Sequence, residues 1–127
     1  MKLLSLLFTL ALSLSALNAS AFEQEAQSRA TTVKLSSEKP LVVGNNTIVF
    51  QIFRDGKATS GDTVTIKSFM PAMPGMPYMD FKEAAKELGD GRYESVVNFS
   101  MSGTWQIHIF ITSSDGKKYR VKTSINL

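Results

Sequence analysis

The sequence contains no cysteine and a single histidine, His108. The lack of cysteine excludes a disulfide framework, a thiolate metal site and a lipid-modified N-terminal cysteine. A soft metal ion would have to be held by thioether or imidazole groups instead. No G-x-S-x-G motif and no paired-carboxylate pattern accompanies the one histidine, so we expect no enzyme activity.

An excess of charge of one sign is also missing. The chain has 14 lysines and arginines against 11 acidic residues, a net charge of +3, and its basic residues form no clustered stripe along the sequence. Nucleic-acid-binding chains usually carry such a cluster. We therefore expect no nucleic-acid partner.

Only one long apolar stretch is present, from Leu3 to Leu17. It follows Lys2 and precedes the small residues 19–21, which is the pattern of a secretory signal peptide cleaved after Ala21. A retained membrane anchor is the alternative, but this interrupted stretch falls short of the roughly twenty residues needed to span a bilayer. We expect residues 1–21 to be removed and the mature chain not to span the membrane.

The remainder is typical of an all-β domain. Residues 22–30 are polar and predict a flexible N-terminal arm, and residues 31–127 form the domain proper. Alternating apolar and polar residues predict six strands, with Asp-Gly pairs marking three tight turns; the strand segments are 31–37, 45–54, 62–69, 91–100, 103–112 and 117–126. Residues 81–88 favour a helix by propensity, but their position before a turn and a strand indicates a seventh, edge strand. The pattern predicts an immunoglobulin-like antiparallel β-sandwich of about seven strands.

The segment FMPAMPGMPYMDF, residues 69–81, departs from this pattern. It places four methionines at a spacing of three with prolines between them: Met70, Met73, Met76 and Met79. Proline favours the polyproline II conformation in itself and in the residue before it, and that helix has three residues per turn. The spacing therefore predicts one edge lined by thioethers.

A fifth methionine, Met101, lies in the turn that the sandwich topology places at the same end of the domain. Thioethers are soft, neutral donors that prefer Cu(I) or Ag(I) to Zn(II), so these five methionines are candidate metal ligands, with Trp105 or Tyr78 as an aromatic cap. The alternative is an adaptable apolar patch for the core or for a partner protein. His108 lies mid-strand, seven residues beyond Met101, and is interpreted as a strand histidine rather than a ligand.

Three motifs carry a family resemblance: MPAMPGM after the third strand, GDGRYES opening the fifth, and MSGTWQIHIFI leading through the sixth, with residues 81–88 counted as the fourth strand. Over residues 31–127 the sequence resembles the YtkA-like group of small exported bacterial domains, which is similar to the FixH-like proteins. The resemblance implies an immunoglobulin-like sandwich in the periplasm or at the cell surface, with a role in copper handling. The function predicted is a periplasmic Cu(I) carrier or buffer. The alternative is a module that docks its methionine edge on a membrane transporter or an oxidase-assembly protein without binding metal.

Overall fold

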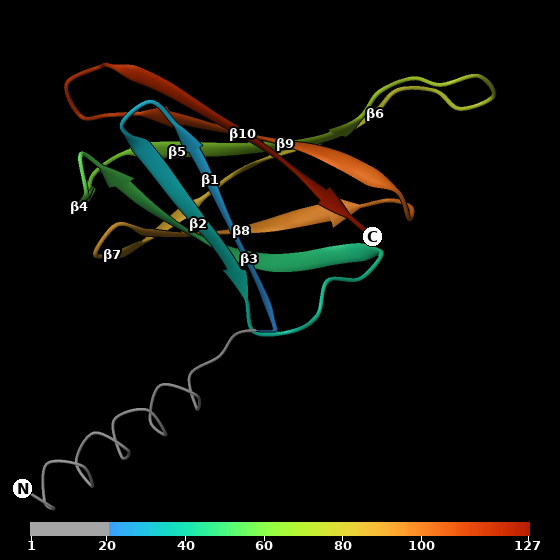
Figure 1. The fold of residues 1–127 in the computed structure, drawn as a ribbon, viewed down its shortest axis with the longest axis horizontal. Helices are drawn as coiled ribbons and strands as arrows, with labels where there is room; N and C mark the ends of the chain where they lie inside the picture. The colour runs from blue at the N-terminus through green and yellow to red at the C-terminus, as the bar shows by residue number, and fades with distance from the viewer. Residues whose placement is uncertain (1–20) are drawn as a thin grey trace, which may run out of the picture.

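The computed structural model describes residues 21–127, and these residues form two antiparallel β-sheets packed face to face (Figure 1). One sheet has six strands: β1 (Phe22–Ser28), β2 (Thr31–Ser37), β3 (Gly44–Arg54), β4 (Lys57–Ala58), β7 (Lys86–Gly89) and β8 (Arg92–Phe99). The other has four: β5 (Thr63–Met70), β6 (Met79–Ala84), β9 (Thr104–Thr112) and β10 (Lys118–Asn126). The predicted antiparallel sandwich is confirmed.

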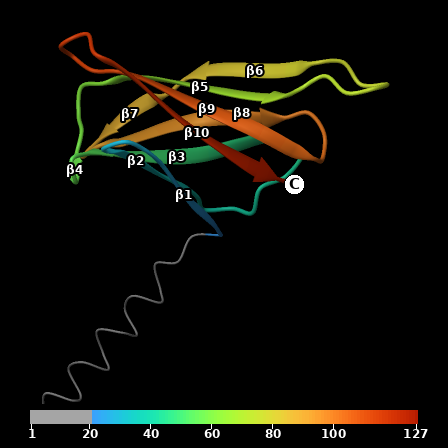
Figure 2. The same ribbon diagram turned by 45° about the horizontal axis from the view of Figure 1, so that its top comes forward.

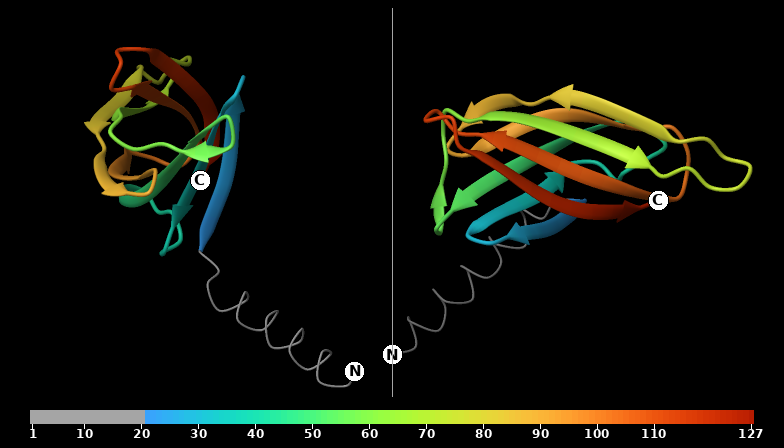
Figure 3. Two further views of the ribbon diagram at one scale, coloured as in Figure 1. Left: turned by 90° about the vertical axis from the view of Figure 1, so that its left-hand side faces the viewer. Right: turned by 90° about the horizontal axis from the view of Figure 1, so that it is seen from above.

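The strand order explains how the two layers are closed. The six-stranded sheet runs β1-β2-β3-β8-β7, with β4 paired to β3, and the four-stranded sheet runs β10-β9-β5-β6. Seen from one end of the strands, in the left panel of Figure 3, the layers lie over one another with β1 along one side. Alternate residues of each strand point inward, and they build a core that includes Val33, Phe50, Tyr93, Trp105 and Ile109, all almost completely buried.

The tight turns predicted at the three Asp-Gly pairs are confirmed. Asp55 and Asp90 adopt positive φ angles of 53° and 56°, which a tight hairpin turn requires. The third Asp-Gly pair lies in the β9–β10 hairpin, where the amide of Ser113 donates to the carbonyl of Lys117 over 2.8 Å. All three pairs therefore reverse the chain between antiparallel strands.

The predicted flexible arm is wrong. Residues 22–28 form β1, which pairs with β2 over its whole length. Ala26 is buried in the core, and the side-chain amide of Gln24 donates to Oγ1 of Thr123 (2.6 Å) and to the carbonyl of Ser124 (2.8 Å) in the opposite sheet. The sequence pattern did not predict this strand, because a hydrogen-bonding glutamine occupies an inward position where an apolar residue was expected.

The predicted edge strand at residues 81–88 is two strands. β6 completes the four-stranded sheet and β7 the six-stranded one, so the chain passes from one layer to the other at Ala85. The amide of Ala85 donates to the carbonyl of Val64 (2.8 Å), and its side chain packs against the core. A small residue at the crossing lets one continuous segment close this side of the sandwich. The strands of residues 21–127 therefore number ten rather than about seven.

The predicted signal peptide, with its cleavage after Ala21, concerns residues 1–21 and lies almost entirely outside the described residues. Export to the periplasm stays a prediction. In residues 21–127, no helix is long and apolar enough to cross a membrane.

Candidate functional site

The four closely spaced methionines lie on a hairpin that projects beyond one end of the sandwich (Figures 1 and 2). Met70 and Met79 form the last pair of β5 and β6. Further out, Met73 and Met76 exchange two backbone hydrogen bonds of 2.9 and 2.8 Å. We call residues 70–79 the methionine hairpin.

The polyproline II edge predicted for this segment is wrong. A polyproline II helix has no internal hydrogen bonds, whereas the hairpin pairs the amides and carbonyls of Met73 and Met76 with each other. Pro74 and Gly75 occupy the two central positions of the turn, and Gly75 has the φ of 81° that a type II turn requires there. The spacing of three thus produces two cross-strand pairs, Met70 with Met79 and Met73 with Met76, in place of one continuous line.

The loop between β8 and β9 lies against the base of this hairpin. The hydroxyl of Ser100 donates to Sδ of Met79 over 3.4 Å. The Met70 methyl group lies so close to Gly103 that a Cβ atom there would come within 2.8 Å of it. The same loop contains Met101, so the sequence-based prediction that all five methionines lie at one end of the domain agrees with this arrangement.

Burial divides the five methionines into two groups. The basal methionines are Met70, which is 3 % exposed and part of the core, and Met79 and Met101, which are half-buried and pack against the core. The tip methionines are Met73, which is 49 % exposed, and Met76, which is half-buried. Unlike the basal methionines, Met73 and Met76 do not pack against the core, and Met73 is the most exposed of the five.

The two aromatic residues expected to cap the site have different positions. Trp105 is buried in the core, where its indole N–H donates to the carbonyl of Met101 over 3.0 Å. Tyr78 is 47 % exposed, and its ring centroid lies 6.0 Å from that of Phe69. Trp105 therefore fixes the backbone of the Met101 loop, and Tyr78 flanks the hairpin on its solvent side.

His108 lies on the outer face of the four-stranded sheet, whereas Met70 points inward from the adjacent strand. Its imidazole makes an edge-to-face contact with Phe69, with centroids 4.8 Å apart. Burial lowers the pKa of His108, and the nearby charges of Lys122, Arg120 and Lys67 lower it further. The histidine is therefore mostly neutral near pH 7, but the sheet separates it from the basal methionines.

Oxygen and imidazole ligands do not gather elsewhere in the described part of the chain. Among residues 21–127, no group of three or more histidine, aspartate or glutamate side chains could hold a metal ion. Among these residues, the tip and basal methionines are the soft donors that the fold brings to one end of the sandwich.

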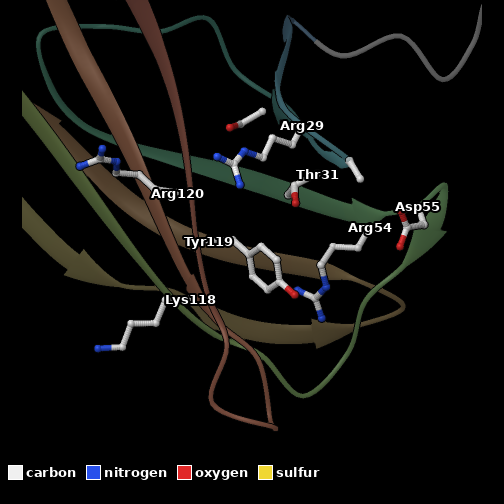
Figure 4. Close-up of a pocket in the computed structure, with 9 residues that line it drawn as sticks. Arg29, Thr31, Arg54, Asp55, Lys118, Tyr119 and Arg120 are labelled. Atoms are coloured by element: carbon white, nitrogen blue, oxygen red, sulfur yellow. The ribbon is translucent and has the colours of Figure 1, made fainter.

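A basic hollow lies at the opposite end of the sandwich (Figure 4). It has a volume of about 490 Å³ and is lined by four cationic residues, Arg29, Arg54, Lys118 and Arg120, and by one acidic residue, Asp55. Arg54 forms an ion pair of 2.9 Å with the buried Asp62, whose hydrogen bond is the main cause of its raised pKa, and it lies 4.8 Å above the ring of Tyr119. Sequence reasoning missed this hollow because its cations come from three separate hairpins.

A two-layer antiparallel sandwich with a projecting methionine hairpin defines a small all-β domain. The chain belongs to the YtkA-like family, whose model matches residues 25–110. The family resemblance expected from the sequence is thereby confirmed. Neither a curated protein nor a solved structure matches the chain.

Proposed function

We propose that this protein is an exported, periplasmic carrier or buffer for Cu(I), and that it also accepts Ag(I), through thioether ligands of the methionine hairpin and Met101. The observation that carries the proposal is the convergence of all five methionines of residues 21–127 on one end of the sandwich. Family membership supports it, because the YtkA-like resemblance implies copper handling.

The chemistry suits an exported, cysteine-free protein. Thiols are captured as disulfides in an oxidising compartment, whereas thioethers coordinate soft ions without losing a proton. Three sulfur ligands satisfy trigonal Cu(I). Because the ligands sit on an exposed loop, they can be given up one at a time to an acceptor.

The tip and basal methionines would contribute differently to the metal site. Met73 and Met76 are directly opposite each other, so their side chains leave the hairpin on the same side and form a two-sulfur clamp. Met79 or Met101, each half-buried at the base, would supply the third sulfur. Met70 is the least available of the five, because its methyl group is packed against Gly103.

An anaerobic competition titration of residues 22–127 against a colorimetric Cu(I) chelator tests the proposal. This segment contains all ten strands and the whole core. We expect stoichiometric Cu(I) binding by the wild type and none by Met73→Leu/Met76→Leu, because leucine preserves apolar volume but has no donor atom. Ag(I) should compete for the site and Zn(II) should not.

Met79→Leu/Met101→Leu is the matched variant with the same number of sulfurs removed. We expect a weakened rather than an abolished site, because the two tip sulfurs remain while the third ligand is lost. Full Cu(I) affinity in Met73→Leu/Met76→Leu would show that the tip methionines are not ligands. No competition by the wild type would reject metal binding altogether.

A docking module is the second candidate, and the exposed apolar residues favour it. Val42, Val43, Met73 and Tyr78 are each about half exposed, and all lie in loops at the methionine end of the sandwich. Under this proposal the end contacts a membrane transporter or an oxidase-assembly protein, as FixH-like relatives would. Leucine should then replace methionine with no loss of partner capture, whereas it should abolish Cu(I) binding under the first proposal.

A further inference from the structure

The outer face of the four-stranded sheet carries a concentration of positive charge that the linear sequence hides. Outward positions of β5, β6, β9 and β10 hold five basic side chains, Lys67, Lys82, Lys118, Arg120 and Lys122, and one acidic side chain, Asp80. Their balance of +4 exceeds the net charge of +3 of the whole chain, so all other residues together balance to −1. The strands lie side by side in the right panel of Figure 3.

The register places three of these lysines and His108 in one row across the sheet. Lys122 is opposite His108, His108 is opposite Lys67, and Lys67 is opposite Lys82. Like charges directly across a sheet destabilise it. Burial lowers the pKa of His108, and the charges of Lys122, Arg120 and Lys67 lower it further, as expected for an imidazole among these cations.

Two lysines of the six-stranded sheet, by contrast, have acidic cross-strand neighbours. On that sheet Lys34 is opposite Glu25, and Lys86 is opposite Glu94. Lys57 on the same sheet is opposite Arg54, so the contrast concerns these two lysines, whereas no basic residue of the four-stranded sheet is opposite an acid. An arrangement that costs folding stability is explained if an anionic partner covers the face.

Aromatic rings are interleaved with these cations. The ammonium group of Lys67 lies 5.3 Å from the centroid of Phe69, and that of Lys82 lies 5.9 Å from the centroid of Phe110. Both rings are half-buried on the same face. Lysines above amphipathic or aromatic surface are typical of protein faces that rest at the boundary between water and lipid.

The layout of the charges indicates the shape of the partner. The row crosses four strands, or about 14 Å at the usual strand spacing, while Lys118, Arg120 and Lys122 extend along β10 in the other direction. A single extended acidic peptide presents a line of charge, whereas a layer of phospholipid headgroups presents a plane. We propose that this sheet face binds the surface of an anionic lipid bilayer, independently of the methionine hairpin.

Vesicle co-sedimentation of residues 22–127 tests the proposal. We expect binding to vesicles of equal parts phosphatidylglycerol and phosphatidylcholine, little binding to pure phosphatidylcholine, and weakening as salt screens the charges. Each lysine near an anionic membrane contributes roughly a fivefold increase in partitioning. Lys67→Gln/Lys122→Gln should therefore reduce binding by about 25-fold.

The matched control is Lys34→Gln/Lys86→Gln, which has the same net charge but changes the six-stranded sheet. Its binding should equal that of the wild type, and circular dichroism of both variants should show the β-sheet spectrum of the wild type. Equal loss of vesicle binding in the two variants would show that only the net charge of the protein matters. That result would overturn the proposal. Absence of binding to anionic vesicles, or equal binding to neutral ones, would also overturn it.

Discussion

At the scale of the residue, equal spacing in the sequence conceals unequal roles. Met70 is a core residue, whereas Met73, three positions later, is half exposed at the tip of the hairpin. The difference arises because the chain leaves the sheet at Met70, so only the first methionine still points into the space between the layers. A thioether in that space contributes packing energy, and one at the tip is available for other chemistry.

Alanine substitutions should separate the two roles. Met70→Ala should lower the free energy of unfolding by about 2–5 kcal/mol, because it leaves a cavity beside Gly103. Met73→Ala, which removes the same side chain from an exposed position, should change it by no more than about 0.5 kcal/mol. Urea denaturation of residues 22–127 measures both, and equal losses would contradict the division into basal and tip methionines.

At the scale of the element, β1 shows how a strand can be held mainly by polar contacts. Its inward Gln24 reaches across to β10 and makes two hydrogen bonds there, and Ala26 alone of its side chains is fully in the core. The segment has the composition of a disordered arm, but its backbone completes the edge of the six-stranded sheet. β1 therefore connects the two layers on the side opposite β6 and β7.

Gln24 and Gln27 form a matched pair for testing β1. Gln24→Ala removes two hydrogen bonds to the opposite sheet and should cost about 1–3 kcal/mol of stability. Gln27 contacts only the carbonyl of Arg29 in its own turn, over 3.3 Å, and Gln27→Ala should cost less than about 0.5 kcal/mol. The backbone amides of β1 should exchange slowly with solvent. Rapid exchange throughout residues 22–28 would instead show that this segment is a flexible arm.

At the scale of the whole molecule, the two ends of the sandwich differ in chemistry. One end gathers methionines and exposed apolar residues, and the other holds the basic hollow and a polar clamp between the layers. In that clamp Arg54 of β3 pairs with Asp62 beside β5, and the backbone amide of Asp62 donates to the hydroxyl of Tyr93. Because Tyr119 of β10 lies beneath Arg54, one guanidinium links both sheets.

Arg54→Met should therefore destabilise the fold well beyond an ordinary surface change. The substitution leaves the Asp62 carboxylate, with a side chain 1 % exposed, without its cation. Fully buried pairs lose about 3–5 kcal/mol in this way; since Arg54 is partly exposed, we expect about 2 kcal/mol. Arg92→Met on the exposed face of β8 is the control, and urea denaturation measures both variants. If Arg54→Met lost as little stability as Arg92→Met, the clamp would not hold the layers together.

The sequence by itself determined the all-β class, the main strands, the turns and the family, because alternation and turn chemistry are local properties of the chain. It also identified the methionines and their common end. Tertiary structure decided that β1 is a strand and that residues 79–89 divide between two sheets, since both depend on partners nearly a hundred residues away or in the opposite layer. It alone turned the methionine spacing into two pairs and aligned lysines from separate strands in one row, because register between strands is set by pairing across the fold and not by order along the chain.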